Sequence, residues 1–338
     1  MSNPIWKLPG ETVPQRTLRG TGRVVGATFV GILAVNFAAL IAMQGVTTNL
    51  GIFLVETKFE LADSMREPVD WIFVGDSTCN QGLSPQEFEV QTGQTAINLC
   101  TTGNMTVVGD VWVLQRALDA AGPPRRGVLV THVYDAWARD EETLRVMGQR
   151  VPGTNEWRRD RALMPADFTE LANANVGRFF PLLTRPRSVD QLIFGLVRER
   201  PTRALDERGF MDGGAARPSM VRQDVREHLA NDDDPAISEL NRRALAAIDD
   251  AVDVPVWIAS APMVDELWAD EGIRERVRTA FEGPHELAEA RPGLRVLRSD
   301  PWRYRADQMS NADHLDGPTA VVHTRAVVEA LRAAGALD

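Results

Sequence analysis

The chain has 338 residues, of which 44% are hydrophobic and 25% are charged, and these values are typical of a globular protein. Its formal net charge of −10 argues against a protein that wraps nucleic acid, because such a protein needs a basic face. Two cysteines are too few for a disulfide scaffold or a cysteine-rich zinc site.

The first informative segment is 24–43, whose 20 residues carry no charge. About 20 apolar residues, each rising about 1.5 Å, span a hydrocarbon core of about 30 Å. We therefore predict a transmembrane signal anchor over 24–48. A buried helix of a soluble protein is one alternative, although such a helix rarely stays uncharged for so long. A cleaved signal peptide is the other, but 43–46 shows no clear cleavage site.

The charges around this segment predict its orientation. Arg16, Arg19 and Arg23 precede the apolar run, whereas Glu56 is the first charge after it. Because basic residues favour the cytoplasmic side, we expect a cytoplasmic tail over 1–23 and a single-pass protein of the cell membrane. The main domain would then be periplasmic or otherwise extracytoplasmic, where disulfides are stable.

After a connector over 49–67, short apolar runs alternate with helical patterns. The runs are rich in β-branched residues and are bounded by Gly, Pro or Asp, which is typical of buried parallel strands. Helices are predicted over 106–120 and 318–334. The alternation predicts an α/β three-layer sandwich with a mainly parallel sheet over 68–338. The predicted strands are 71–75, 95–99, 127–133, 254–260 and 294–297.

The alternation stops between 138 and 250, a region rich in Arg, Asp and Pro. We interpret 138–250 as an inserted, mainly helical region. Within it, 179–197 (FFPLLTRPRSVDQLIFGLV) mixes basic and apolar residues. Such a segment either packs as a helix on the core or lies on a membrane surface.

A polar turn follows the first predicted strand, in WIFVGDSTCNQGLSP (71–85). Functional groups of open parallel sheets collect at the carboxyl ends of strands, and Ser77 lies at such an end. A serine hydroxyl needs a base to become a nucleophile. Of the five histidines, His314 suits this task best, because it lies in a polar loop between the last strand and the last helix. His132, at the end of another strand, is the reserve candidate.

Three blocks in chain order resemble the SGNH (GDSL) hydrolase superfamily: GDS after a strand, NLCTTGN (98–104) and NADHL (311–315). PVDWIFVGDSTCNQGLSP (68–85) is similar to the opening block of the membrane-anchored O-acyltransferase branch. That branch includes alginate O-acetyltransferases and the D-alanylation protein of lipoteichoic acid synthesis. The resemblance covers about 68–137 and 254–334 and implies an SGNH-like fold.

The resemblance implies roles for individual residues. Ser77 would be the nucleophile, His314 the base and Gly103 an oxyanion-hole donor. The family usually has Asp three residues before the histidine, where this chain has Asn311. Asn311 would orient the imidazole less effectively than a carboxylate, and Asp313 is a possible substitute. The oxyanion-hole asparagine of the superfamily has no clear match in 131–137.

Cys79 and Cys100 follow the first and second predicted strands. Three interpretations remain open. A disulfide would join the Ser77 loop to the Gly103 loop if the Cα atoms lie roughly 4.4–6.8 Å apart. Two small buried thiols are the second interpretation, and a cysteine nucleophile at Cys79 is the third.

The resemblance implies an O-acyltransferase or esterase that acts on a cell-surface polysaccharide through an acyl-enzyme on Ser77. It implies no metal and no organic cofactor, and as partners it suggests the lipid bilayer and a multi-spanning membrane O-acyltransferase. The alternative is a catalytically degenerate SGNH-like domain that serves as a structural subunit of a membrane complex. Asn311 and the missing oxyanion asparagine favour this alternative.

Overall fold

The computed structural model describes residues 15–43, 50–141, 143–144, 163, 205–231 and 233–338. Its centre is a five-stranded sheet in which all neighbouring strands run parallel. The predicted α/β class and the mainly parallel sheet are confirmed. The strand order is β2 (Ala96–Asn98), β1 (Trp71–Gly75), β3 (Gly127–His132), β4 (Val256–Ser260) and β6 (Leu294–Arg298).

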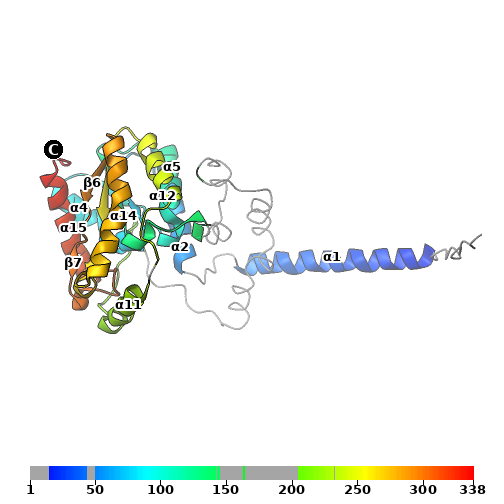
Figure 1. Cartoon of the computed structure of the whole chain (residues 1–338). Helices are drawn as coiled ribbons and strands as arrows, with labels where there is room; N and C mark the ends of the chain where they lie inside the picture. The colour runs from blue at the N-terminus through cyan, green and yellow to red at the C-terminus, as the bar shows by residue number, and fades with distance from the viewer. Residues whose placement is uncertain (1–14, 44–49, 142, 145–162, 164–204, 232) are drawn as a thin grey trace, which may run out of the picture.

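Helices cover both faces of this sheet (Figure 1). Every residue of β1 is buried, as expected for a strand between two helical layers. Trp71 and Phe73 contact the ring of Phe88 in one layer, with ring centroids 5.7 and 5.1 Å apart. This layer contains α3 (Ser77–Gly82), α4 (Pro85–Thr92) and α15 (Gly317–Ala333). The opposite layer contains α2 (Leu50–Ser64), α5 (Thr106–Ala121), α12 (Glu239–Ala251) and α14 (Glu271–Ala290).

Shorter elements lie in the connections between these layers. A two-stranded parallel sheet, which the sequence did not predict, pairs β5 with β7. The short elements are η1 (Gly103–Met105), η2 (Tyr134–Ala136), α11 (Pro218–Ala230), β5 (Met263–Val264), α13 (Asp265–Trp268), β7 (Arg303–Tyr304) and η3 (Ala306–Gln308).

Within the segment expected as a connector over 49–67, residues Leu50–Ser64 form α2. This helix packs against α5 and buries the apolar side chains Val55 and Phe59. It also buries Lys58, whose Nζ donates to Asn98 O at 2.6 Å and to Asn98 Oδ1 at 3.0 Å. Burial lowers the pKa of Lys58 well below its ordinary value, although Asp206 opposes this shift. The α/β body therefore begins before residue 68.

The expected insert over 138–250 is described only in part, since 145–162 and 164–204 lie outside the described residues. The possible membrane-surface segment 179–197 falls in this undescribed part. The described portion contains α11 and α12, and α12 packs against α5 and α14. The end of the expected insert therefore belongs to one helical layer of the α/β body.

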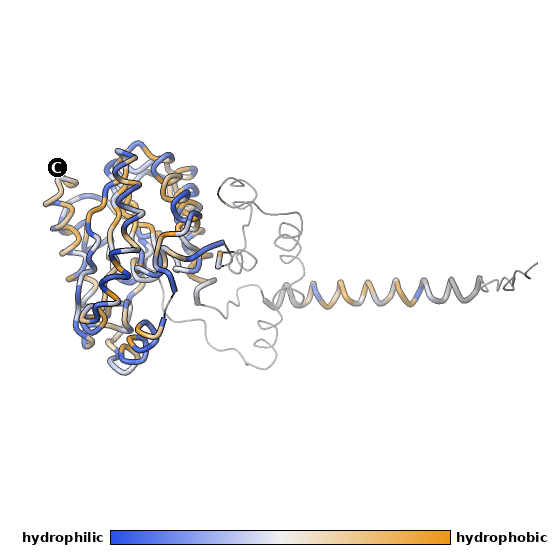
Figure 2. Tube along the Cα trace, viewed as in Figure 1, coloured by the Kyte–Doolittle hydropathy of each residue, from blue (hydrophilic) through white to orange (hydrophobic). Residues whose placement is uncertain are grey.

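The N-terminal helix α1 (Gln15–Met43) extends away from the α/β body (Figure 1). Apolar residues run along it (Figure 2), and Val24, Phe29 and Phe37 are 66%, 62% and 65% exposed. Within the described residues, however, no helix combines the length and the apolar character that crossing a bilayer requires. The span expected over 24–48 is thus not found there, and residues 44–48 lie outside the described part.

Candidate active site

Ser77 lies at the carboxyl end of β1. The strand β1 is flanked by β2 and β3, and the order of the strands in the sheet changes direction at this point. The turn depends on Gly75, which has φ of +149°. A Cβ atom on this residue would lie 2.0 Å from the carbonyl oxygen of Thr131. Asp76 then caps α3, because its side chain accepts a hydrogen bond from Thr78 N–H. This turn places half-buried Ser77 as the first residue of α3.

His314 reaches Ser77 from a loop 237 residues further along the chain. An antiparallel bridge between Met309 and Leu315 closes this loop, and Ser310 N–H donates to the carbonyl of His314 at 2.8 Å. The imidazole Nε2 lies 2.8 Å from Ser77 Oγ. The structure therefore brings the predicted nucleophile and base into hydrogen-bonding contact.

Two side chains approach the other imidazole nitrogen, Nδ1 of His314. Asp313 Oδ1 lies 2.6 Å away and Asn311 Oδ1 lies 2.8 Å away. Asn311 Oδ1 also accepts the backbone N–H groups of His314 at 2.7 Å and Asp313 at 3.2 Å. A single Nδ1–H bonds more strongly to the carboxylate, because charge-assisted hydrogen bonds are the stronger ones. Asp313 is therefore the better orienting partner, and the amide of Asn311 shapes the turn.

The local charges favour the protonated imidazole. Burial alone would lower the pKa of His314, but the adjacent Asp313 carboxylate, together with Asp76 and Asp224, outweighs burial, so that the pKa lies above its ordinary value. Burial likewise favours the neutral form of Asp313, but His314 reverses this effect and lowers the pKa of the carboxyl. Asp313 thus stays ionised and stabilises an imidazolium, which is the form that His314 takes after accepting a proton.

Gly103 begins η1, in the loop that follows β2. Thr101 N–H donates to the carbonyl of Gly75 at 2.7 Å, which ties this loop to the end of β1. A disulfide between Cys79 and Cys100 connects α3 with the same loop, with Cα atoms 5.8 Å apart. The structure thus resolves the three interpretations of the cysteines in favour of the disulfide. Gly103 lies on a segment fastened to the Ser77 helix.

Residues of α11 that the sequence did not single out flank the Ser77–His314 pair. Asp224 Oδ2 accepts the backbone N–H of Ala312 at 3.4 Å, and His228 Nδ1 lies 3.2 Å from the hydroxyl of Tyr134. His228 is half-buried. Its positive form would lower the pKa of Asp313, so His228 adds to the charge balance of the site.

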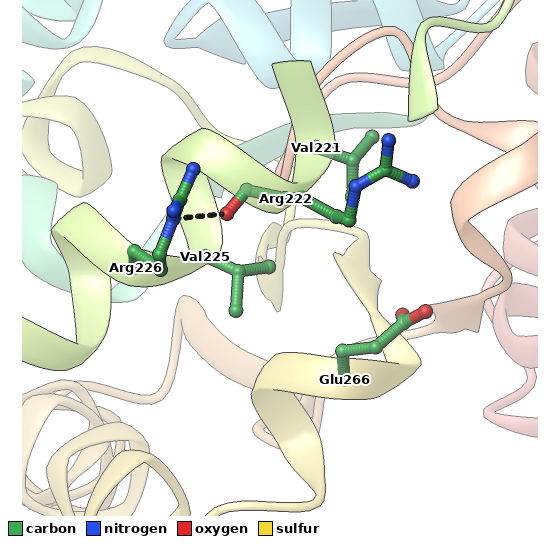
Figure 3. Close-up of a pocket in the computed structure, with 5 residues that line it drawn as sticks. All are labelled: Val221, Arg222, Val225, Arg226 and Glu266. Carbon is green, nitrogen blue, oxygen red and sulfur yellow. Dashed lines mark hydrogen bonds between the residues drawn. The ribbon is translucent and has the colours of Figure 1, made fainter. Parts of the chain in front are cut away.

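The same helix borders a separate pocket of about 340 Å³ between α11 and α13 (Figure 3). On the α11 side of the pocket, Arg226 Nε donates to the backbone carbonyl of Arg222, one helical turn earlier, at 3.2 Å. Ser77 and His314 are not among the residues that line the pocket. Its lining consists of Val221, Arg222, Val225, Arg226 and Glu266.

The reserve candidate His132 does not contact Ser77. Its Nε2 lies 2.6 Å from Asp110 Oδ2, and both side chains are buried. Asp110 is a charged residue among apolar neighbours in the sequence of α5, and a buried carboxylate requires a partner. In the sequence, the single charge of Asp110 among apolar residues was the feature from which its pairing with His132 could have been predicted.

Comparison with known proteins gives only distant structural likenesses. No protein-family model matches the chain, and no curated protein matches it. Among solved structures it is similar to LAE5, an alpha/beta hydrolase enzyme from the metagenome of Lake Arreo, Spain. The identity is 11%, the match covers 81% of this chain and 98% of that chain, and the TM-score is 0.36. A likeness at this level establishes neither a family nor a function.

Proposed function

We propose that this protein is an SGNH-type serine acyltransferase or esterase that forms an acyl-enzyme on Ser77. The observation that carries the proposal is the line of contacts from Ser77 Oγ through His314 to Asp313, at 2.8 and 2.6 Å. A nucleophile, a base and an orienting group in hydrogen-bonding sequence are the features that serine acyl transfer requires.

The geometry supports a two-step reaction. With Nδ1–H donated to Asp313, the lone pair of His314 Nε2 faces the hydroxyl of Ser77. As Oγ attacks an acyl carbonyl, its proton passes to Nε2, and the imidazolium then gives that proton to the departing donor group. In the second step His314 takes a proton from an acceptor hydroxyl, whose oxygen attacks the ester carbonyl, and the imidazolium returns that proton to Ser77 Oγ as the bond between Oγ and the acyl group breaks. The backbone N–H groups of Ser77 and Gly103 would bind the oxyanion.

The acceptor and the location follow from the sequence resemblance. We infer that the acceptor is a hydroxyl of a cell-surface polysaccharide and that residues 24–48 anchor the protein in the cell membrane. The uncharged run 24–43 and the exposed apolar side chains of α1 support the anchor. A multi-spanning membrane O-acyltransferase would supply the acyl group from the cytoplasm.

The test uses full-length protein and p-nitrophenyl acetate as the acyl donor. We expect intact-mass analysis to show one added acetyl group, which peptide mapping places on Ser77. Ser77→Ala should remove the adduct, whereas Ser64→Ala, at an exposed serine of α2, should leave it unchanged. Absence of any adduct on folded wild-type protein would refute the proposal.

The alternative, a degenerate domain with a structural role, predicts that the nucleophile and the base have separated. Their distance of 2.8 Å and the carboxylate beside Nδ1 give that alternative no support. The missing family aspartate at position 311 is offset by Asp313, two residues later.

A further inference from the structure

A second group of charged side chains lies beneath the Ser77 turn, apart from Ser77, His314 and Asp313. It consists of Asp76 at the end of β1, Asp110 on α5 and His132 at the end of β3. The side chains of all three are at most 1% exposed. A buried charge is costly unless it is paired, so a cluster of three requires an explanation.

The imidazole of His132 lies between the two carboxylates. Its Nε2 is 2.6 Å from Asp110 Oδ2, and its Nδ1 is 3.6 Å from Asp76 Oδ2. Each nitrogen thus faces a carboxylate oxygen. A neutral imidazole would present a lone pair to one of these oxygens, whereas an imidazolium presents N–H to both. The indole of Trp137 packs against the ring, with centroids 5.0 Å apart and the two planes inclined at 60°.

Asp76 connects this cluster to the nucleophile, because it directly precedes Ser77 in the chain. Its Oδ1 accepts Thr78 N–H at 2.9 Å, and its Oδ2 accepts Val133 N–H at 2.8 Å. One carboxylate therefore holds the first turn of α3 and the end of β3 together. Its charge also acts on His314, where it raises the pKa of the imidazole.

We propose that Asp110 and His132 are positioning residues for Ser77: the charged imidazole, held by Asp110, keeps the Asp76 carboxylate ionised and in place, and Asp76 in turn fixes the nucleophile turn. The catalytic effect of this device rests on the proposed acyl transfer, but its structural effect does not. Neither Asp110 nor His132 touches the reacting atoms.

The charge state of the cluster follows from its geometry. Burial alone would lower the pKa of His132, but Asp110 and Asp76 together raise it to about 9. Within the described residues, these two carboxylates are the charged groups that act on His132. Support for the Ser77 turn should therefore be complete at neutral pH and should fade as the pH rises through about 9.

The central variant is Asp110→Asn, which keeps the shape of the side chain and removes its charge. The matched control is Asp119→Asn, the same change at an exposed position of the same helix. Full-length protein with isotope-labelled histidine is titrated by NMR, and His132→Gln identifies the resonance. Amide hydrogen exchange at Thr78 and Val133 reports the turn without any need for activity.

We expect His132 of the wild type to be protonated at pH 7 and to titrate in the alkaline range. Asp110→Asn should move the titration of His132 to lower pH. It should accelerate hydrogen exchange at the amides of Thr78 and Val133 by at least about tenfold. It should also slow acylation of Ser77 by p-nitrophenyl acetate about 10–100-fold, with little change in KM. On the alkaline side, the pH at which acylation begins to slow should fall together with the pKa of His132. Asp119→Asn should change none of these quantities more than about twofold.

Two results would overturn the proposal. One is a neutral His132 at pH 7 in the wild type, a measurement that does not depend on whether any variant folds. The other is a folded Asp110→Asn protein with wild-type exchange and an unchanged pH profile. If the wild type forms no acyl-enzyme while titration and exchange behave as expected, the acyl-transfer function fails and the positioning device stands.

Discussion

At the scale of single residues, Asp313 and Asn311 have different tasks at His314. Asp313 accepts Nδ1–H, whereas Asn311 accepts two backbone N–H groups of the turn. We expect Asp313→Asn to slow acylation of Ser77 by about 10³–10⁴-fold, because an amide stabilises the imidazolium poorly. Asn311→Ala should slow it less and should lower the free energy of unfolding by about 1–2 kcal/mol. Burst kinetics and urea denaturation measure both effects, and the reverse ranking of the two rates would contradict this assignment.

His323 makes the stability of the fold sensitive to acid. Its ring is buried, with Nδ1 3.1 Å from the hydroxyl of Tyr304. Burial, helped by Arg298, lowers the pKa of His323 to about 3. The unfolded chain has a histidine pKa of about 6.5, so between these pH values the unfolded state binds a proton that the folded state does not. Stability should therefore fall as the pH falls, by about 1.4 kcal/mol per pH unit.

His323→Gln isolates this contribution, since glutamine can accept the hydrogen bond from Tyr304 but does not titrate. Urea denaturation of both proteins between pH 4 and pH 7 measures it. The wild type should lose more free energy of unfolding across this range than the variant. Parallel pH profiles of the two proteins would show that folding does not shift the pKa of His323.

The predictability of the site differs from residue to residue. Ser77 and His314 could be predicted because each lies in a polar stretch at the carboxyl edge of the expected sheet. The preference for Asp313 over Asn311 could not, because it depends on which backbone amides occupy the asparagine oxygen. The contacts of His228 were missed because its helix reads as a charged, solvated segment, and only the tertiary fold places it beside Tyr134.

At the scale of elements, the end of β1 should be the position least tolerant of a side chain. Gly75 has φ of +149°, and a Cβ there would lie 2.0 Å from the Thr131 carbonyl. We expect Gly75→Ala to destabilise the protein by about 3 kcal/mol or more. Gly93→Ala is the matched control, because Gly93 has φ of +71° but a Cβ there would have no neighbouring atom within 4 Å. The control should cost only about 1–2 kcal/mol. Equal losses in urea denaturation would show that the contact with Thr131 is unimportant.

The disulfide between α3 and the Gly103 loop should also contribute to stability. Cys79 and Cys100 are 21 residues apart, and closing a loop of this length in the unfolded chain corresponds to about 3 kcal/mol. We expect Cys79→Ala combined with Cys100→Ala to lower the free energy of unfolding by about this amount. Each single variant should lose at least as much, because it leaves an unpaired thiol in the core. A non-reduced digest of the wild type that shows two free thiols would contradict the bond itself.

The helices and strands were predictable to different degrees. The five main strands could be located because a parallel sheet covered on both faces requires short continuous apolar runs. The helix α2 was missed because its apolar residues continue the long uncharged stretch before it, so that no pattern marks its start. The paired strands β5 and β7 have two residues each, which is too short for any periodicity to appear.

At the scale of the whole molecule, the proposed membrane anchor requires one orientation of the chain. Arg16, Arg19 and Arg23 precede the uncharged run, and basic residues remain on the cytoplasmic side. The disulfide near Ser77 is consistent with a catalytic domain in an oxidising compartment. We therefore expect residues 1–23 to be cytoplasmic and the α/β body to be extracytoplasmic, with the active site facing the glycans of the cell surface.

Protease accessibility in sealed vesicles of known orientation tests this expectation. In right-side-out vesicles the α/β body should be cleaved, and an epitope tag at the N-terminus should be protected. The double variant Val30→Arg and Val35→Arg places two charges in the apolar run, each of which disfavours insertion by about 2.5–3.5 kcal/mol at the centre of a span. It should move the protein from the membrane fraction to the soluble fraction, whereas Val30→Leu with Val35→Leu should not. A cleaved N-terminal tag with a protected body would reverse the topology. Such a reversal would place Ser77 on the cytoplasmic side, where it could not reach a cell-surface polysaccharide.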